Sequence, residues 1–433
     1  MIIVDTALAN RAEAGNPILF GMFGAGFMGR GILNQGRYLR GIRCAAVCNR
    51  TIESAVDALT LAGIDNFEVV DTAAHLDEVI NEGSTGITDD PQVLVESESL
   101  ECLLEATGHV EYGAHVVTRA IESGKHIVLM NAELDGTVGP LLKSRADEAG
   151  VSYSGSDGDQ PAVQLNLYRF VSSLGLRPLV CGNIKGLQDR YRNPTTQRSF
   201  ARQWGQTPSM VTSFADGTKI SFEQAIVANA TGMQVAQRGM QGMEYEGHVD
   251  DLVGRYDLEQ LRRLGGVVDY VVGPKPSPGV YVLAEAHDET QALYLRYGKL
   301  GDGPLYSFYV PYHLTIFEAP LTIARVVELG DVAIAPAGGP KVDVITAAKT
   351  DLKAGERIDG LGGYLTYGLC ENYEVTRREG LLPIGLAEGS VLQRDVAKDE
   401  LISVNDVEHP RDTLIHRLRA EQDALFAPVG LSS

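Results

Sequence analysis

Through the first 150 residues, apolar runs of strand length alternate with stretches that have helical spacing. The apolar runs begin at Ile18, Ile42, Glu101 and His126, and a final one covers 150–154. A polar, alanine-rich segment at 5–15 precedes the first run and predicts a short helix. Strands that alternate with helices in this way are typical of a parallel α/β sheet. We therefore predict a Rossmann dinucleotide-binding domain over residues 1–154, with a helix at 139–149.

After Ser154 the pattern changes to longer helical stretches and aromatic or β-branched strands. The spacing predicts a helix at 161–174, a strand at 180–184, a polar loop at 185–196 and further helices at 197–212 and 221–230, with a hairpin-like turn or strand edge at 216–219. The runs at 267–272, 280–283 and 305–309 predict a mostly antiparallel sheet. A helix at 314–328 follows and is a candidate to pack back on the first domain. We assign 155–335 to a central α+β domain that binds substrate and associates with other copies.

The segment Pro336-Ala337-Gly338-Gly339-Pro340 indicates a linker. Beyond it, short strands and turns predict a small β-rich domain over 336–410, and 411–433 predicts an amphipathic helical tail. The whole chain therefore belongs to the α/β class, with three domains and a tail.

The first strand leads into Gly24-x-Gly26-x-x-Gly29, and a helix-compatible stretch follows. The first glycine permits the turn, the second lets backbone approach a pyrophosphate, and the third lets the helix pack on the strand. The helix start then offers free N–H groups to phosphate oxygens. The predicted contacts are Gly24, Ala25, Gly26, Phe27, Met28 and Gly29. The competing interpretation is a glycine-rich turn in an unrelated α/β domain.

The second strand ends in Asn49-Arg50, where an NAD site usually carries an acidic residue for the ribose 2′-hydroxyl. An arginine without a carboxylate suits a 2′-phosphate, so NADP(H) is favoured over NAD(H). Alternatively, Arg50 stacks on adenine or faces solvent. At the other end of the cofactor, Thr107, Gly108, Asn131 and Glu133 follow strand ends and should lie near the nicotinamide.

The composition adds limits on partners. The 433-residue chain has a formal net charge of −20, which argues against a nucleic-acid or anionic membrane surface. No apolar run is long enough to span a membrane and no signal-peptide pattern appears, so we expect a cytoplasmic protein. Its five cysteines form no CxxC pair and indicate buried, reduced thiols. A homo-oligomer is expected by analogy with related folds.

Hydride transfer to a carbonyl needs a proton donor and groups that orient the substrate. Lys185 ends a predicted strand beside a polar loop, where it could bond a developing alkoxide. Lys219 and Glu223 are four residues apart, and if helical they form either a surface ion pair or a functional pair. His313 lies in an aromatic run and is interpreted as structural more readily than as an acid or base.

Asp157 and Asp159 flank Gly158 and have two interpretations. Alternating carboxylates can bind a divalent cation that polarises a hydroxy ketone. They can equally cap the next helix or bind a substrate hydroxyl, which is the interpretation we favour. In the loop, Arg190, Arg192, Asn193, Thr195 and Thr196 could hold a phosphate or a polyol, or form a solvated face.

Several motifs together resemble a known family. They are the Ser277-Pro278-Gly279 segment with Gly273-Pro274, Pro311-Tyr312-His313-Leu314-Thr315, Ala319 to Arg325, Asp216-Gly217-x-Lys219 with Glu223, and Ala228-Asn229-Ala230-Thr231-Gly232. The chain resembles homoserine-dehydrogenase-like oxidoreductases with a C-terminal SAF domain, which is matched by Asp351-Leu352-x-Ala354-Gly355-Glu356. Within that group it is most similar to the deoxyxylulose-5-phosphate reductoisomerase-like enzymes.

The resemblance implies an NAD(P)-dependent enzyme and supports Lys219 and Glu223 in catalysis, to which the residue chemistry adds Lys185 and Asp159. The predicted substrate contacts are Asp157, Arg190, Asn193, Thr195, Thr196 and Asn229, although the loops at 156–161 and 185–196 differ from those of the reductoisomerase-like enzymes. In homoserine dehydrogenases an Asn-Lys pair follows the corresponding strand; here it is Asn131-Ala132, which disfavours homoserine oxidation. The expected substrate is a small polyhydroxylated or phosphorylated carbonyl compound or alcohol, with a carbon-skeleton rearrangement as one option. The alternatives are a simple dehydrogenase and a non-catalytic dinucleotide- or sugar-binding protein.

Overall fold

The computed structural model describes residues 3–427 and divides into two compact units. The first unit contains residues 3–159, 314–335 and 417–425, and the second contains 160–313, 336–416 and 426–427. Residues 1–2 of the predicted first domain and 428–433 of the predicted tail lie outside the described residues.

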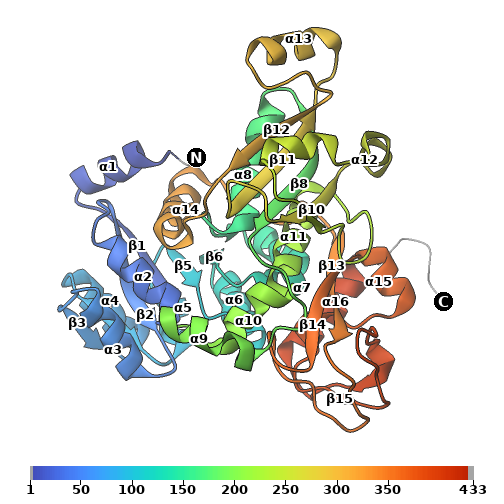
Figure 1. Cartoon of the computed structure of the whole chain (residues 1–433). Coiled ribbons are helices and arrows are strands. Elements are labelled where there is room, and N and C mark those ends of the chain that lie inside the picture. The colour runs from blue at the N-terminus through green and yellow to red at the C-terminus, as the bar shows by residue number, and fades with distance from the viewer. Residues whose placement is uncertain (1–2, 428–433) are drawn as a thin grey trace. The chain divides into compact units, whose positions relative to one another are not determined.

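The first unit is built on a seven-stranded parallel sheet with the strand order β3-β4-β2-β1-β5-β6-β7, drawn in blue to cyan in Figure 1. Apart from the edge strand β3, its strands are almost wholly buried, as expected where helices cover both faces of a parallel sheet. The strands are β1 (Ile18–Phe23), β2 (Ile42–Cys48), β3 (Phe67–Val69), β4 (Thr85–Thr88), β5 (Cys102–Glu105), β6 (His126–Leu129) and β7 (Tyr153–Gly155). The Rossmann arrangement predicted from the alternating pattern is confirmed.

Helix α1 precedes β1, and helices α2 to α7 connect successive strands of this unit. They are α1 (Asp5–Glu13), α2 (Phe27–Gly36), α3 (Ile52–Leu61), α4 (Ala73–Asn81), α5 (Pro91–Glu96), α6 (Val110–Glu122) and α7 (Ala132–Glu148). The prediction for α7 began seven residues too late, because Gly136, Gly139 and Pro140 weaken the helical pattern. The Asn131 side chain caps this helix by accepting from the Leu134 N–H at 3.1 Å.

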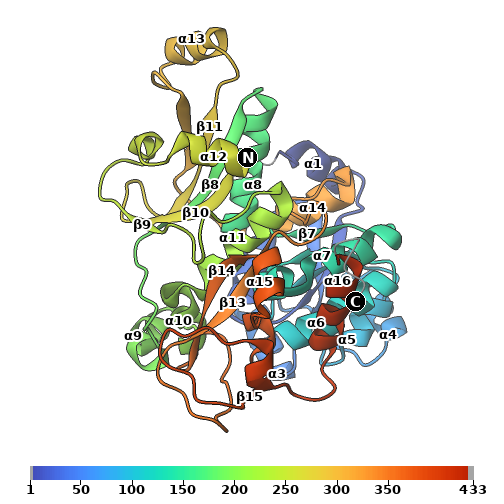
Figure 2. The same ribbon diagram turned by 90° about the vertical axis from the view of Figure 1, so that its right-hand side faces the viewer.

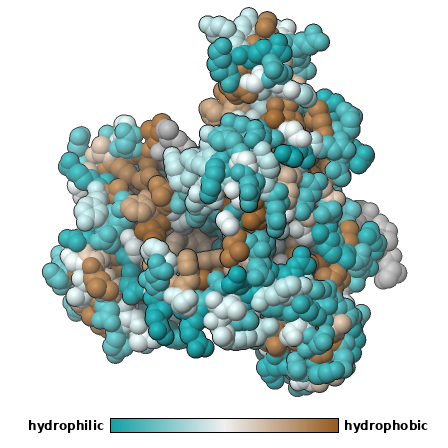
Figure 3. Space-filling view, viewed as in Figure 1, coloured by the Kyte–Doolittle hydropathy of each residue, from teal (hydrophilic) through white to brown (hydrophobic). Residues whose placement is uncertain are grey.

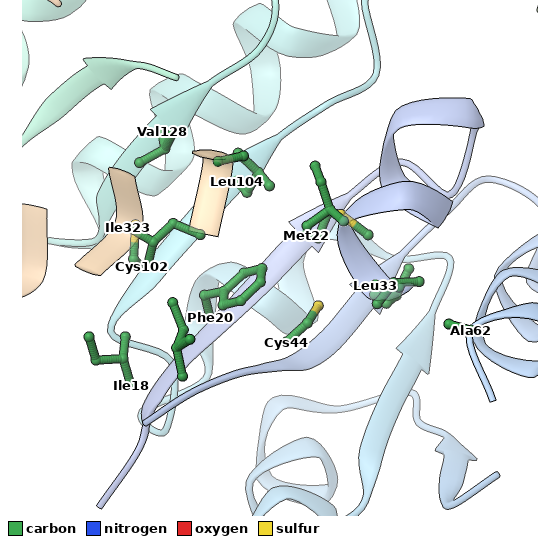
Figure 4. Close-up of a cluster of buried hydrophobic side chains, with 14 of the residues drawn as sticks. Ile18, Phe20, Met22, Leu33, Cys44, Ala62, Cys102, Leu104, Val128 and Ile323 are labelled. Atoms are coloured by element: carbon green, nitrogen blue, oxygen red, sulfur yellow. The ribbon is translucent and has the colours of Figure 1, made fainter. Parts of the chain in front are cut away.

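The core of the first unit includes a helix from far along the chain. In Figure 4, Phe20 and Met22 of β1 lie among side chains of β2, β5 and α2, and Ile323 belongs to α14 (Thr315–Leu329). Phe20, Met22 and Ile323 are all at most 1% exposed. Helix α14, which the sequence placed at 314–328, contacts α2 and β1. Burial of this apolar face stabilises the sheet by the hydrophobic effect.

The second unit contains a five-stranded mixed sheet in the order β12-β11-β8-β10-β9. Its strands are β8 (Arg177–Lys185), β9 (Met243–Glu244), β10 (Val267–Val272), β11 (Gly279–Glu285) and β12 (Leu305–Val310). Strand β11 is antiparallel to β8 and β12, but β10 is parallel to β8 and β9. The sequence analysis expected a mostly antiparallel sheet. The long helical connection between β8 and β10 allows the parallel pairing.

The helices of the second unit differ from the prediction where tight corners interrupt them. The expected helix at 197–212 is two helices, because Gly205 ends the first with φ 64° and Thr207 caps the second. The segment at 216–219 is a corner between two helices, with φ 97° at Gly217, and no hairpin forms there. The helices are α8 (Gln160–Ser173), α9 (Pro194–Trp204), α10 (Pro208–Asp216), α11 (Thr218–Thr231), α12 (Leu258–Leu264), α13 (Glu289–Tyr297) and α15 (Tyr373–Glu379), with the 3₁₀ helix η1 (Val249–Gly254).

Beyond the linker, short strands and 3₁₀ turns form two small hairpins. Strands β13 (Val342–Ala348) and β14 (Thr366–Asn372) pair with each other, and both lie beside α11 (Figure 2). Strands β15 (Val391–Leu392) and β16 (Val407–Glu408) form the second pair. The 3₁₀ turns are η2 (Ile384–Leu386) and η3 (Val404–Asp406), and α16 (Leu414–Leu425) follows them.

The visible surface is mainly hydrophilic, with apolar side chains scattered over it (Figure 3). Helix α13, at the tip of the β11–β12 connection, has no buried residue and exposes Tyr294 and Tyr297. Among residues 3–427, the helices include none with the length and apolarity needed to cross a bilayer.

The close approach of α2 to β1 gives a stability prediction. A Cβ atom on Gly29 would lie 2.3 Å from the Gly24 carbonyl oxygen, so Gly29→Ala should force the helix outward. We expect a loss of about 1–3 kcal/mol, as for other overpacked positions. The control is Gly36→Ala in the same helix, where an added Cβ meets nothing within 4 Å. Urea unfolding should show destabilisation in the first variant only; equal midpoints would contradict the packing argument.

Candidate active site

The glycine-rich turn has the shape that a dinucleotide needs. Gly24 has φ 100°, and a Cβ there would lie 3.1 Å from the Ala106 carbonyl oxygen. Gly26 is the N-cap of α2, with no side-chain cap, and a Cβ on it would meet nothing within 4 Å. The backbone is therefore open to a ligand at the position where a helix N-terminus presents free N–H groups. The residues fit a pyrophosphate.

Asn49 supports this turn through two hydrogen bonds to backbone. Its Oδ1 accepts from the Ala25 N–H at 3.0 Å, and its Nδ2 donates to the Thr51 carbonyl at 2.8 Å. Asn49 was predicted to lie at the ribose. These bonds instead give it a role in shaping the Gly24-x-Gly26-x-x-Gly29 loop, the dinucleotide fingerprint. Arg50, the next residue, is exposed at the end of β2 and remains the group available for a ribose phosphate.

The strand order reverses between β1 and β5, since β2 to β4 lie on one side of β1 and β5 to β7 lie on the other. Ligands of open α/β sheets bind at such a switch point, outside the carboxyl ends of the strands. Glu105 is the last residue of β5, pairs with Phe23 of β1, and is fully buried. Its Oε1 accepts from the N–H of Thr107 at 2.9 Å and from the Thr107 hydroxyl. Burial raises the pKa of this carboxyl to about 7.

The predicted nicotinamide-end residues lie at this same edge. Asn131 is fully buried and donates from Nδ2 to the His109 carbonyl at 3.2 Å, besides capping α7. Glu133, in the first turn of α7, is 4% exposed. Thr107 and Gly108 form the turn after β5, and Gly108 has φ 71°. The structure therefore brings these four residues together at the ends of β5 and β6.

In the second unit, three buried polar side chains meet between β8, α8 and α11. Asn183 of β8 donates from Nδ2 to Glu223 Oε2 at 2.9 Å, and Gln160 begins α8 beside both. Their exposed fractions are 0% for Asn183, 2% for Glu223 and 7% for Gln160. Buried polar groups of this kind require hydrogen-bond partners, so the cluster fixes the three elements relative to one another.

The Gln160 amide lies against the Glu223 carboxyl. With its nitrogen facing Glu223, it donates to both carboxyl oxygens at 2.9 Å. Asn183 and Gln160 therefore both donate to Glu223.

Two lysines lie at the same end of the second unit. Lys185 is the last residue of β8, two positions after Asn183, and alternation along a strand places both on one face of the sheet. Lys219 is in the first turn of α11, one turn before Glu223 and on the same face of that helix. Both lysines are half-buried. The three candidate catalytic residues of this unit therefore share one end of β8 and α11.

Asp157 is fully buried in the first unit and already faces a cation. Its Oδ2 accepts from the Thr322 hydroxyl at 3.2 Å, and both its oxygens lie 3.5 Å from Arg325 Nη1. A guanidinium at this distance competes with a divalent ion, so the residues do not fit a metal centre. Asp159 directly precedes α8 and is half-buried. Residues 3–427 contain no group of three or more His, Cys, Asp and Glu side chains placed to hold a metal ion.

In the loop after β8, most polar side chains serve the local structure. Asn193 and Thr196 form a reciprocal capping box at the start of α9, and Thr195 shares a hydrogen bond with Tyr364 at 2.8 Å. Arg190 donates to the Tyr367 hydroxyl at 3.4 Å and lies over that ring.

Asn229 likewise has a structural role, which the sequence analysis did not anticipate. Its Oδ1 accepts from the N–H groups of Lys341 and Val342 at 2.7 and 3.1 Å, where β13 begins. Binding a substrate through this side chain would require breaking those bonds.

Lys349 anchors the corner before α11. It is 5% exposed, and its Nζ donates to Asp216 Oδ2 at 2.9 Å and to the carbonyls of Arg192 and Gly363 at 2.8 Å. Burial raises the pKa of the Asp216 carboxyl even with this lysine beside it. Asp216 also accepts from the Thr218 N–H at 2.9 Å and so holds the first residue of α11.

Four buried polar residues were not predicted from the sequence: Glu105, Asn183, Gln160 and Lys349. Asn183 and Glu105 are polar residues at the ends of apolar strands, and that contrast is the signal that could have identified them. Lys349 and Gln160 carry no comparable pattern, because only the fold brings them to their partners.

A parallel sheet with a pyrophosphate-shaped glycine turn, joined to a unit with a buried acid and two lysines, defines an NAD(P)-dependent oxidoreductase. In agreement, residues 158–319 match the family model described as "Oxidoreductase DRL, catalytic domain". The match covers the central part of the chain, including the whole Asn183–Gln160–Glu223 cluster. A search of curated proteins found no match to this sequence.

Solved structures give only distant likenesses. A probable dehydrogenase from Thermotoga maritima has 12% identity and a TM-score of 0.42, covering 74% of this chain and 91% of its own. An amine dehydrogenase from Mycobacterium smegmatis has 13% identity and a TM-score of 0.39, covering 74% of this chain and 94% of its own. Likeness at this level says nothing about what the chain acts on.

The open space at Gly26 yields a binding prediction. Gly26→Ala should leave the protein as stable as the wild type, since the added methyl meets no protein atom within 4 Å. The methyl should instead occupy room that the pyrophosphate needs and weaken NADPH binding about tenfold or more. NADPH fluorescence titration measures the affinity, and urea unfolding is the control. An unchanged dissociation constant would place the pyrophosphate elsewhere.

Removing Lys349 should destabilise the protein. Lys349→Met leaves Asp216 buried without its cation, which typically costs about 3–5 kcal/mol. Lys353→Met, at an exposed lysine 2.8 Å from Asp395, is the matched control and should leave stability nearly unchanged. Urea unfolding of both variants tests this, and similar midpoints would show that the buried pair contributes little.

Proposed function

We propose that the chain is an NADP(H)-dependent oxidoreductase that acts on a small polyhydroxylated or phosphorylated carbonyl compound or alcohol. The observation that supports this best is the cluster of Glu223, Asn183 and Gln160 with Lys185 and Lys219 at one end of β8 and α11. When bound, the cofactor supplies or accepts the hydride. The residues of the chain must then manage the proton and orient the substrate.

Glu223 is a carboxyl held at a defined position, as an acid or base group requires. It is 2% exposed, and its oxygens accept from Asn183 Nδ2 at 2.9 Å and from the Gln160 nitrogen at 2.9 Å. We assign Glu223 the role of acid or base, with Asn183 and Gln160 as positioning residues.

The two lysines supply positive charge next to this acid. A lysine ammonium can donate to a carbonyl oxygen and stabilise the alkoxide that forms during hydride transfer. It can equally bind a phosphate as a point charge. We assign Lys185 to the reacting oxygen and Lys219 to the Glu223 proton exchange. Arg190, in the loop after β8, and Asp159, directly before α8, are further candidate substrate groups.

The preference for NADP(H) rests on Arg50. With Asn49 engaged by the fingerprint loop, the end of β2 presents an exposed arginine and no carboxylate from these two positions. This favours a 2′-phosphate, because a guanidinium bonds phosphate oxygens in a bidentate manner. Tighter binding of NADPH than of NADH would support the assignment.

The finer classification also remains a proposal. We infer that 336–410 is a SAF-type domain from the Asp351-Leu352-x-Ala354-Gly355-Glu356 segment, and that the enzyme forms homo-oligomers. A rearrangement of the carbon skeleton coupled to hydride transfer, as in the reductoisomerase-like enzymes, would show itself in product mass and carbon connectivity. A simple dehydrogenase would keep the skeleton intact.

Turnover by variants tests the catalytic assignment. Lys185→Ala and Glu223→Gln should each reduce turnover about 10²- to 10⁴-fold, the usual contribution of acid–base groups. NADPH affinity should stay unchanged, because both residues lie in the second unit. NADPH oxidation is followed with a panel of phosphorylated and unphosphorylated aldoses, ketoses and hydroxy ketones. Lys353→Ala serves as the control.

Two outcomes would contradict the proposal. Near-normal rates in the Lys185 variant would remove its catalytic assignment. NADPH binding by the wild type without turnover on any compound of the panel would favour the non-catalytic binding protein.

A further inference from the structure

We propose that Glu105 discriminates between the oxidised and reduced forms of the bound dinucleotide. As a carboxylate it favours the oxidised nicotinamide, which is a cation, and as a neutral acid it does not. The inference rests on the NADP(H) binding proposed above and adds a property that the fingerprint itself does not confer. Glu105 acts here as an electrostatic residue and takes no part in hydride or proton transfer to the substrate.

The position of Glu105 brings its charge to the cofactor edge of the sheet. It ends β5, directly beside the end of β1, at the point where the strand order reverses. The turn that follows it touches the fingerprint, since a Cβ on Gly24 would lie 3.1 Å from Ala106 O and 3.3 Å from Thr107 Cγ2. The nicotinamide half of a dinucleotide binds outside the strand ends on this side of the switch point.

The buried environment of Glu105 reduces the screening of its charge, so the carboxylate can interact with a nearby cation. The side chain is fully buried, and Thr107 donates two hydrogen bonds to Oε1. Its Oε2 makes no hydrogen bond within residues 3–427. A carboxylate that is only half satisfied, and shielded from water, is weakly screened. It therefore interacts with a nearby cation more strongly than a surface carboxylate does.

The protonation state of Glu105 is balanced near neutrality. Burial raises the pKa of its carboxyl to about 7, although the Thr107 hydrogen bonds and the adjacent Asn131 amide oppose this. The titratable groups that face it are Glu133 of α7, Tyr112 of α6 and Tyr153 of β7. Burial raises the pKa of both phenols further above neutrality, so they keep their protons in this range. His109 lies in the same turn.

Binding and proton release are then linked. The oxidised nicotinamide carries a positive charge that the reduced ring lacks, so its binding should lower the pKa of Glu105 and release a proton. Reciprocally, deprotonation of Glu105 should strengthen binding of the oxidised form. The reduced form should bind with little dependence on this group.

The experiment measures dissociation constants of NADPH, by its fluorescence, and of NADP⁺, by displacement of NADPH, from about pH 5.5 to about pH 8.5. The ratio of the NADPH constant to the NADP⁺ constant should rise about three- to tenfold with a midpoint near 7. Calorimetry in two buffers of different ionisation enthalpy should detect proton release with NADP⁺ only. In Glu105→Gln the ratio should be constant and proton release absent.

Two variants serve as controls. Asp135 is another buried carboxyl of this unit; burial raises its pKa to about 6, and its Oδ1 accepts from the Tyr153 hydroxyl at 2.8 Å. Asp135→Asn should retain the wild-type pH dependence, and so should His109→Gln. Loss of the dependence in either variant, or its persistence in Glu105→Gln, would overturn the proposal.

A third variant keeps the test valid if Glu105→Gln does not fold. Thr107→Val removes a hydrogen bond that stabilises the carboxylate, so the midpoint of the ratio should move to higher pH. An unmoved midpoint would contradict the assignment. Binding of both nucleotides with a pH-independent ratio in the wild type would overturn this inference alone, whereas binding of neither would defeat the proposed cofactor as well.

Discussion

The arrangement of the first unit depends on how closely α2 approaches β1. With Gly29 almost touching the Gly24 carbonyl, the helix can begin immediately after the strand and direct its first N–H groups outward. Asn49 then fixes the turn from the neighbouring strand, and the Ala106–Thr107 turn closes against it from the other side. No side chain caps α2, so its first N–H groups are free to bind a cofactor. Their position depends on the close contact between Gly29 and the Gly24 carbonyl.

The sequence was sufficient to predict the first unit because its strands are buried on both faces and read as continuous apolar runs. The spacing of Gly24, Gly26 and Gly29 located the turn, because this motif is also a short-range pattern in the sequence. The second unit was harder to predict. Gly205 and Gly217 break a helical pattern at corners that only tertiary packing requires, and the parallel pairing of β10 arises from a connection of more than 80 residues whose course no local pattern reveals. The candidate residues Lys219 and Glu223 followed from motif resemblance, whereas Asn183 and Gln160, the buried neighbours of Glu223, became apparent only from the fold.

Residues beyond the linker are integral to the second unit. The Gly368 N–H of β14 donates to Thr218 Oγ1 at 3.0 Å, and Ser221 Oγ donates back to the Gly368 carbonyl at 3.2 Å. Together with Lys349 and the Asn229 contacts, these bonds attach β13 and β14 to α11 along its length. The helix that carries Lys219 and Glu223 therefore owes its position to a segment more than 100 residues later, which explains how substitutions in that segment could affect catalysis without any contact to substrate.

The segmented composition of the first unit has a consequence for its synthesis. Ile323 and its neighbours in α14 complete a core whose other members precede residue 130, and the Gln422 side chain of α16 bonds to the backbone of α7. During synthesis from the N-terminus, about 180 further residues must be made before α14 can cover the apolar face of this sheet. Chaperones that bind nascent chains would recognise the exposed apolar surface of such an intermediate. A chain truncated before α14 should therefore aggregate and should not fold as an independent nucleotide-binding domain.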